Sequence, residues 1–379
     1  KRRHDARSTQ GQLVELTPYI FARPGVMGGY LDLSQDIAAD RLEHNELPVL
    51  ACPEEIAGWL GIPLGRLAWL LHRFEHNYSP VSQSKSHYAY RWISKRSGGE
   101  RLIEAPKHAL RTAQQKILRE ILQKIPPHSA AHGFTVGRSI VSNARPHVQQ
   151  AIVIRLDLQN FYASVSFAHV VAIFRSLGYS REAAIWLGRL TTSTLPQDLV
   201  QQSFTDSKWR PYTRRHLPQG ACTSPALANL AAFSLDLRLS GLARRFKAQY
   251  TRYADDITFS GGDDLRGRLH VLLPLVRAIV RSERLRLNSK KLRVLRRNRR
   301  QIVAGVVVNA GINGCRRDFD RLKAILTNCI RSGPASQNRD QHPAFAQHLL
   351  GRIAFIRQLN AVRGDKLLAL YRKIRWDQS

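Results

Sequence analysis

Acidic residues are scarce in this chain of 379 residues: 28 Asp and Glu stand against 59 Lys and Arg, which leaves a formal net charge of +31. Such an excess repels itself unless an anionic partner neutralises it, and the phosphate backbone of a nucleic acid is the obvious partner. A basic ribosomal-type protein or a membrane-surface protein has the same balance. Charge alone therefore leaves these three classes open.

Cysteines and long apolar runs are scarce as well. The four cysteines are Cys52, Cys222, Cys315 and Cys329. They form no CxxC pair, which argues against a disulfide framework or a zinc knuckle and makes a reducing cytoplasm the default compartment. The best apolar stretch, Val271 to Val280, contains Pro274 and Arg277 and is too short for a membrane span. Because Lys1 is neither an initiator Met nor followed by an apolar signal core, we interpret it as the trimmed end of a longer chain.

The pattern of apolar residues predicts an α+β chain. Residues 88–106 alternate like a hairpin, Ala151 to Leu158 is a buried strand, and residues 249–260 form a strand, a turn and a strand. Val303 to Asn309 is the last expected strand, and the chain after Asp318 is helical apart from a loop at Ser332 to Gln341. Further helices are expected at 53–60, 64–76, 109–125, 167–176, 181–190, 224–240 and 264–283.

Three carboxylates stand at the ends of expected strands. Asp157 ends the buried strand, and Asp255-Asp256 lie at the tip of the hairpin 249–260. Phosphoryl transfer to a growing nucleic acid needs two divalent ions about 4 Å apart, bridged by carboxylates on adjacent strands. Hard oxygen ligands suit Mg²⁺. An isolated Asp-Asp pair is more often a solvated turn, so the surrounding motifs decide the interpretation.

Four separated motifs, in order along the chain, resemble those of the reverse transcriptases. Tyr253-Ala254-Asp255-Asp256 is the hallmark of that superfamily, and Ile154 to Tyr162 resembles the strand with the first metal aspartate. Leu217 to Pro225 is similar to the segment that receives the incoming nucleotide and the templating base. Lys95 to Pro106 resembles the fingers hairpin.

This resemblance implies roles for individual residues. Asp157 and Asp255 would bind both metal ions, with Asp256 as the supporting carboxylate; the ions would be Mg²⁺, with Mn²⁺ as a substitute. Lys291 matches a lysine proposed as the general acid toward pyrophosphate. The expected nucleotide-binding residues are Lys95 and Arg101 on the triphosphate, the steric gate Tyr162 with its neighbour Phe161, Gln219 beside the sugar and base, and Gly220, which lets the backbone approach the substrate closely.

Two further stretches resemble bacterial retron reverse transcriptases. Asn143 to His147 forms an NAxxH motif, and Val303-Ala304-Gly305 stands where retron enzymes usually carry Val-Thr-Gly. Between Arg281 and Arg300, ten of twenty residues are Lys or Arg, interleaved with apolar residues, which favours strands with one basic side. The expected RNA-binding residues are Asn143, His147, Arg293, Arg296, Arg297, Val303, Ala304 and Gly305.

The resemblance implies a right-hand polymerase with fingers, a palm of antiparallel sheet packed on helices, and an α-helical thumb. We expect an N-terminal extension of unknown role at 1–52, a helical region and fingers at 53–150, the palm with fingers insertions at 151–314, and the thumb at 315–379. The chain shows no ribonuclease H unit, so template removal would need a host ribonuclease H.

The same resemblance implies partners for a cytoplasmic bacterial protein. They are deoxynucleoside triphosphates, a cognate folded noncoding RNA that serves as primer and template, the DNA product branched from that RNA, and an effector protein in anti-phage defence. An oligomer and a contact through residues 1–52 stay open. Two alternatives remain: a stand-alone or CRISPR-associated reverse transcriptase on generic templates, and a polymerase-like RNA-binding scaffold without synthesis.

Overall fold

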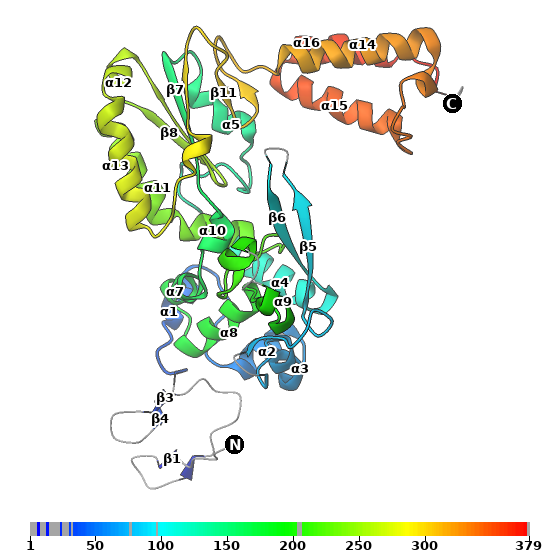
Figure 1. The fold of residues 1–379 in the computed structure, drawn as a ribbon. Coiled ribbons are helices and arrows are strands. Elements are labelled where there is room, and N and C mark those ends of the chain that lie inside the picture. Colours follow the sequence, from blue (N-terminus) through cyan, green and yellow to red (C-terminus); the bar gives the residue numbers. More distant parts are fainter. Residues whose placement is uncertain are drawn as a thin grey trace. The chain divides into compact units, whose positions relative to one another are not determined.

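The computed structural model describes residues 33–75, 78–95, 98–202 and 207–376, together with the backbone of short strands before residue 32. These strands pair as β1 (Ala6–Arg7) with β2 (Leu13–Val14) and β3 (Arg23–Pro24) with β4 (Tyr30–Leu31). Residues 33–52 of the expected N-terminal extension are thus described, whereas the part before residue 33 is described only at these short strands. The chain forms two compact units, Lys1–His128 with Gln159–Ser234, and Ser129–Leu158 with Leu235–Ser379 (Figure 1).

The first unit is mainly helical. Pro53 and the acidic Glu54 and Glu55 occupy the first turn of α2, where a missing N–H and negative charge are both favourable. The helices of this unit are α1 (Ala39–His44), α2 (Pro53–Leu60), α3 (Leu64–Leu70), α4 (His108–Glu120), η2 (Leu122–Lys124), α6 (Phe161–Ser164), α7 (Phe167–Leu177), α8 (Arg181–Thr191), α9 (Gln197–Gln202), η4 (Ser207–Tyr212) and α10 (Ser224–Ala231).

The hairpin predicted at 88–106 is confirmed as β5 (Tyr88–Ser94) and β6 (Glu100–Pro106), paired antiparallel from Tyr88 opposite Pro106 to Ser94 opposite Glu100. Alternate residues of β6 are buried, beginning with Leu102. Leu102 packs in an apolar cluster with Leu195, Leu199, Trp209 and Tyr212. Arg101, one residue before Leu102, is exposed and points to the opposite face of β6.

The second unit contains an antiparallel sheet in the order β10-β7-β9-β8. Its strands are β7 (Ile152–Asp157), β8 (Gln249–Tyr253), β9 (Asp256–Gly261) and β10 (Arg293–Arg296). The apolar residues Ile152, Val153 and Ile154 of β7 are fully buried, as the run of β-branched residues predicts for a central strand. The helices of this sheet region are α5 (Ile140–Ala144), η3 (Arg145–His147), α11 (Phe233–Arg245), α12 (Asp263–Gly267), α13 (Leu269–Ser282) and η5 (Ser289–Lys291).

Two long helices predicted from periodicity are each divided in the structure. The stretch 224–240 separates into α10 and α11 at Ala232, and 264–283 separates into α12 and α13 at Arg268. Both dividing residues leave the helical region, with ψ of 6° at Ala232 and 12° at Arg268. Neither dividing residue is glycine or proline, but Gly267 lies directly before Arg268 and is a local signal for the second division.

The strand predicted at Val303–Asn309 is wrong. The structure has a tight hairpin there, β11 (Ile302–Val303) paired with β12 (Val306–Val307). Ala304 and Gly305 form its two-residue turn and both have positive φ, 45° and 85°. Two-residue hairpin turns with positive φ at both central positions match the twist of the flanking strands. The apolar run Val303–Asn309 therefore contains the end of β11, the turn and all of β12, and is not one continuous strand.

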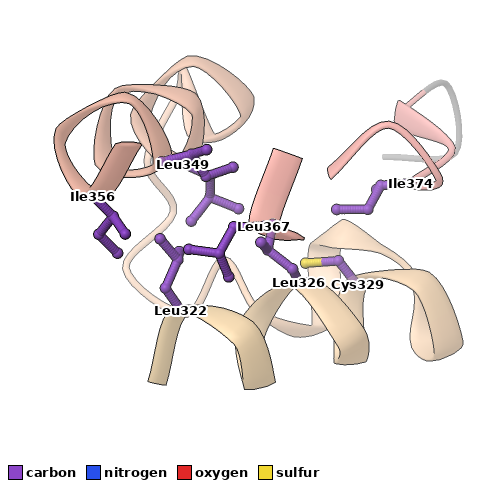
Figure 2. Packing of buried hydrophobic residues seen from close by; sticks show 8 residues of the cluster. Leu322, Leu326, Cys329, Leu349, Ile356, Leu367 and Ile374 are labelled. Atoms are coloured by element: carbon purple, nitrogen blue, oxygen red, sulfur yellow. The ribbon is translucent and has the colours of Figure 1, made fainter. Parts of the chain in front are cut away.

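The helical C-terminal segment is confirmed. It consists of α14 (Arg316–Ser332), η6 (Pro334–Ser336), α15 (Phe345–Leu359) and α16 (Ala361–Tyr371). Apolar residues three and four apart on α14 and α15 point into a common core, as expected for amphipathic helices. That core contains Leu322, Leu326, Cys329, Leu349, Ile353, Ile356, Leu367 and Ile374 (Figure 2). Among the described residues, no helix combines the length and apolar character needed to cross a membrane.

Candidate active site

The three predicted metal ligands lie at one end of the antiparallel sheet. Asp157 is the last residue of β7 and stands directly opposite Asp256, the first residue of β9. The backbone N–H of Leu158 donates to the carbonyl oxygen of Asp255 at 2.9 Å. Directly opposed residues in a sheet have Cβ atoms about 5 Å apart. The strand pairing thus brings together carboxylates that are about 100 positions apart in the sequence.

A buried ion pair supports the turn that carries Asp255. Ala254 has φ of 56°, a left-handed conformation that residues with a Cβ adopt at a cost. The Arg252 guanidinium donates to the Ala254 carbonyl at 3.0 Å and is held by Asp236 of α11 through two bonds of 2.6 and 2.8 Å. Tyr250 donates to the same carboxylate. Asp236 and Arg252 are both fully buried, so the charges interact without solvent screening.

Gly133 fits closely against the same turn. A Cβ built on Gly133 would lie 2.6 Å from the backbone nitrogen of Ala254, closer than side chains tolerate. The neighbouring segment is fixed by the N–H of His132, which donates to the carbonyl of Arg252 at 2.8 Å. The sequence pattern alone gives no role for Gly133. The structure shows that it allows two backbones to approach.

We expect Gly133→Ala to lower the free energy of unfolding by about 1–3 kcal/mol, because overpacking forces a backbone shift. Denaturant titration of the purified chain would measure this. Gly241→Ala is the matched control, since Gly241 lies in α11 and an added Cβ there would meet no atom within 4 Å. Alanine is favoured over glycine in a helix, so the control should be neutral or stabilising. Equal effects of the two changes would contradict the close approach.

Cations balance part of the negative charge at this end of the sheet. The Lys291 ammonium lies 2.7 Å from Asp157 Oδ1, and Arg155 Nη2 is 3.9 Å from Asp256 Oδ1. Burial raises the pKa of Asp255, and the charges of Asp256 and Asp157 raise it further. Burial also raises the pKa of Asp256, where Arg155 acts in the opposite direction. The carboxylates thus repel one another, and added positive charge would stabilise their ionised forms.

The chemistry of these residues fits divalent ions, because all three supply hard carboxylate oxygens. Within the described parts of the chain, however, no group of three or more His, Cys, Asp or Glu side chains is arranged to hold a metal ion. The Asp157 carboxylate instead accepts a hydrogen bond from the Lys291 ammonium. The backbone N–H of Asn288 also donates to the Asp157 carbonyl at 2.8 Å, which fixes this lysine-bearing segment beside the strand.

The predicted nucleotide-binding residues all belong to the first unit. Glu104 N–H donates to the Gln219 carbonyl at 2.8 Å, and Leu217 N–H donates to the Val165 carbonyl at 3.0 Å. These bonds connect the hairpin β5–β6, the loop Leu217–Gly220 and the segment that follows α6. Lys95 closes the hairpin turn through its N–H to Gly99, and Arg101 is exposed on β6. Phe161 is buried, whereas Tyr162 and Gln219 are half-buried and Gly220 is exposed.

The predicted RNA-binding residues fall into three groups. Arg293, Arg296 and Arg297 are exposed on and beside β10, the edge strand of the sheet, while Ala304 and Gly305 form the turn described above. Val303, Asn143 and His147 are buried. In this structure the side chains of these three residues are therefore not exposed for contact with RNA, and their assignment to RNA binding stays a prediction.

His147 has a structural role in the second unit. Its ring nitrogens lie 2.6 Å from Ser260 Oγ and 2.7 Å from Thr251 Oγ1. Ser260 belongs to β9 and Thr251 to β8, so the imidazole joins two neighbouring strands. Burial lowers the pKa of His147 to about 3, and the ring is neutral at physiological pH. The NAxxH motif thus stabilises the sheet that carries the carboxylates.

Comparison with known proteins defines the class. The family model "Reverse transcriptase (RNA-dependent DNA polymerase)" matches residues 93–308, more than half of the chain and all of the strands that carry the carboxylates. The chain belongs to the reverse transcriptase family, and its enzymatic activity is RNA-directed DNA polymerisation. Members of this family generally use divalent metal ions.

The relatives place the chain among the retron reverse transcriptases. Retron Mx65 reverse transcriptase of Myxococcus xanthus is 38% identical over 89% of this chain and 74% of the relative. Retron Mx162 reverse transcriptase of the same organism is 34% identical over 87% of this chain and 68% of the relative. Retron Ec86 reverse transcriptase of Escherichia coli is 27% identical over 88% of this chain and 92% of the relative.

Proposed function

We propose that this enzyme copies one cognate, structured noncoding RNA into single-stranded DNA by two-metal phosphoryl transfer at Asp157, Asp255 and Asp256. The observation that supports the site is the register of β7 and β9, which sets Asp157 opposite Asp256 with Asp255 in the adjoining turn. The observation that supports the substrate class is the similarity to retron reverse transcriptases over most of the chain.

Two Mg²⁺ ions, with Mn²⁺ as a substitute, would activate the attacking hydroxyl and stabilise the leaving oxygen of pyrophosphate. Asp157 and Asp255 would hold both ions, and Asp256 would support them. Lys291 already lies at this end of the sheet through its contact with Asp157. An ammonium released from that carboxylate can neutralise or protonate the departing pyrophosphate, which fits Lys291 as a general acid.

The proposed nucleotide site is formed by residues of the first unit. Lys95 and Arg101 would bind the triphosphate, as cations placed where negative charge accumulates during the transfer. Gln219 and Gly220 would contact the sugar and base. A Cβ on Gly220 would lie 2.9 Å from the carbonyl oxygen of Glu104, and φ at Gly220 is 135°. Because Gly220 has no Cβ, the loop can lie directly against β6, and Gly220 itself stays exposed to solvent.

Tyr162 is proposed as the steric gate that excludes the ribose 2′-OH, with Phe161 packed beneath it; their ring centroids are 5.8 Å apart. We expect Tyr162→Ala to increase the relative use of ribonucleotides by about ten- to a hundredfold, because it removes a clash worth about 1–3 kcal/mol. Competition of each ribonucleotide with its deoxynucleotide in primer extension would measure this. Tyr162→Phe keeps the bulk and should leave discrimination unchanged; unchanged discrimination in Tyr162→Ala would remove Tyr162 from this role.

Selection of the RNA is proposed to involve the basic surface around β10. Arg293, Arg296 and Arg297 are exposed there, next to the exposed Arg299 and Arg300. Such a cluster binds phosphates strongly and in a salt-dependent way. The Ala304-Gly305 turn would add backbone contacts, since Ala304 lacks the hydroxyl that the related motif supplies. DNA synthesis would begin from a 2′-OH of an internal guanosine of the same RNA.

In the cell, we propose that the RNA–DNA product and the enzyme act with an effector protein in anti-phage defence, that a host ribonuclease H removes the template, and that the complex is cytoplasmic. Oligomers of the complex belong to the same proposal. The similarity to retron enzymes favours this function over a stand-alone or CRISPR-associated enzyme on generic templates. The three carboxylates disfavour a scaffold without synthesis. A double variant Asp255→Asn, Asp256→Asn that protected cells as well as the wild type would instead support a scaffold.

The proposed function is tested by expressing the chain with its neighbouring genomic DNA and sequencing the nucleic acid that co-purifies. We expect one short DNA joined to one structured RNA by a 2′–5′ linkage that a debranching enzyme cleaves. The Asp255→Asn chain, expressed in the same way, should carry the RNA without the DNA. Heterogeneous nucleic acid, together with activity on ordinary primed templates, would assign the enzyme to the generic-template alternative.

A further inference from the structure

Glu104 and His216 form a buried pair behind the loop Leu217–Gly220. Glu104 lies on β6 of the hairpin, and His216 directly precedes the loop. His216 Nε2 is 2.8 Å from Glu104 Oε2, and their side chains are 2% and 0% exposed. A charged pair placed this deep is costly unless its geometry is good and its bonds are satisfied. Neither residue belongs to the set predicted to touch nucleotide or metal.

The hydrogen bonds of His216 indicate that its ring is protonated. Nδ1 lies 2.7 Å from the carbonyl oxygen of Arg214, and Nε2 faces the Glu104 carboxylate. A carbonyl and a carboxylate both accept, so each ring nitrogen must donate. Burial by itself lowers the pKa of His216, but the charge and the hydrogen bond of Glu104 outweigh burial and raise it. The bond between the two residues is therefore charge-assisted, the stronger kind.

The same two residues hold the backbone on both sides of the loop. Glu104 N–H donates to the Gln219 carbonyl at 2.8 Å, and His216 exchanges two backbone bonds of 2.9 Å with Ser193. The other carboxylate oxygen, Glu104 Oε1, has no hydrogen-bond partner among the described residues. The position of the Glu104 side chain therefore depends on His216. Together the pair fixes the start of the loop and the carbonyl of Gln219.

We infer that Glu104 and His216 are positioning residues for the incoming nucleotide: their charged pair holds the loop Leu217–Gly220 against the hairpin β5–β6. This inference rests on the proposed function, in which Gln219 and Gly220 contact the nucleotide. The pair touches no substrate. It acts by fixing the loop before binding, so its loss weakens nucleotide binding while leaving the carboxylates of the other unit, and thus the chemical step, unaltered.

The test compares Glu104→Gln with Glu182→Gln in the full chain bound to its RNA. The first change removes the charge but keeps the shape of the side chain. Glu182 is an equally buried carboxylate of the same unit, but it accepts from Trp186 Nε1 at 2.7 Å, away from the loop. We expect Glu104→Gln to raise the KM for deoxynucleotides about tenfold with kcat within about twofold, the signature of lost binding. Glu182→Gln should lower Tm without changing KM.

His216→Gln gives a second, independent measurement. If the two residues act as one unit, the double variant Glu104→Gln, His216→Gln should raise KM by less than the product of the two single effects. A Glu104→Gln chain with lowered Tm and unchanged KM would overturn the inference, because the pair would then be only structural. Gln219→Ala distinguishes a failure of this inference from a failure of the proposed nucleotide site. If it raises KM while Glu104→Gln does not, only the inference fails; if neither raises KM, the proposed nucleotide site fails with it.

Discussion

Replacement of Asp255 by Asn is expected to lower kcat by about a thousandfold or more and, at the same time, to raise Tm. The loss of activity follows from the proposed two-metal site, where one bridging carboxylate contributes several kcal/mol of transition-state stabilisation. The gain in stability follows from the raised pKa of Asp255, since burial and the nearby Asp256 and Asp157 disfavour its ionised form. An uncharged amide of the same shape removes that cost.

The pH dependence of this stability gain has a definite sign. A carboxyl group whose pKa is higher in the folded than in the unfolded chain loses stability as the pH rises above the unfolded value, about 3.9 for Asp. The difference in Tm between variant and wild type should therefore grow as the pH rises from about 3.9 towards the raised pKa of folded Asp255, and should stay constant above that pKa. It should be measured in EDTA, because bound cations would cancel the repulsion.

Asp264→Asn is the control for the first prediction. Asp264 is exposed in the first turn of α12 and lies in the same unit. Its replacement removes the same charge without touching the cluster, so activity should stay within about twofold and Tm should not rise, since acidic residues favour the first turn of a helix. An Asp255→Asn chain with wild-type activity would exclude Asp255 from the metal site, and one with a lower Tm would contradict the repulsion.

Replacement of Asp236 by Asn is expected to lower the free energy of unfolding by about 3–5 kcal/mol, because it leaves the charge of Arg252 buried without a counter-ion. Thermal unfolding should show this as a fall in Tm on the order of 10 °C. Activity should fall as well, since Arg252 also holds the Ala254 carbonyl in the turn that carries Asp255.

Glu283→Gln provides the comparison for the second prediction. Glu283 pairs with Arg238 at 2.7 Å, but this pair is partly exposed, with Arg238 43% accessible. Solvent screens such pairs, so the change should cost less than about 1 kcal/mol. If Asp236→Asn were as mild as Glu283→Gln, the buried pair would not be what stabilises the turn.

The sequence predicted the parts of the site that depend on local pattern. The strand ending at Asp157 and the hairpin around Asp255 and Asp256 are confirmed as β7, β8 and β9. Alternation and the hairpin tip are visible in consecutive residues, and the order of the motifs supplied the pairing of strands far apart in the chain. Local pattern and motif order together were sufficient for the strands that carry the carboxylates.

The sequence could not predict which charged side chains are buried in the protein interior. Nothing distinguishes Arg252 from the many exposed arginines of this basic chain until α11 brings Asp236 beside it. The same holds for Glu104 of the hairpin, which is fully buried beside His216. Pairs of this kind are made by tertiary contacts between elements, which neither periodicity nor local composition records. The burial of Asn143 and His147, which were predicted to bind RNA, also depends on tertiary contacts and has no local signal in the sequence.

Three hydrogen bonds that link Ser260, His147, Thr251 and Asn143 also determine which ring nitrogen of His147 carries the proton. Thr251 Oγ1 donates to the carbonyl of Asn143 at 3.3 Å, so its oxygen must accept from His147 Nε2. The Nδ1 atom of the neutral ring then has only a lone pair and must accept from Ser260. The chain of bonds therefore runs in one direction, from Ser260 through the imidazole to Asn143, and selects one tautomer. In chemical terms, the four-residue spacing of Asn143 and His147 lets a backbone carbonyl dictate the tautomer of the ring that follows it.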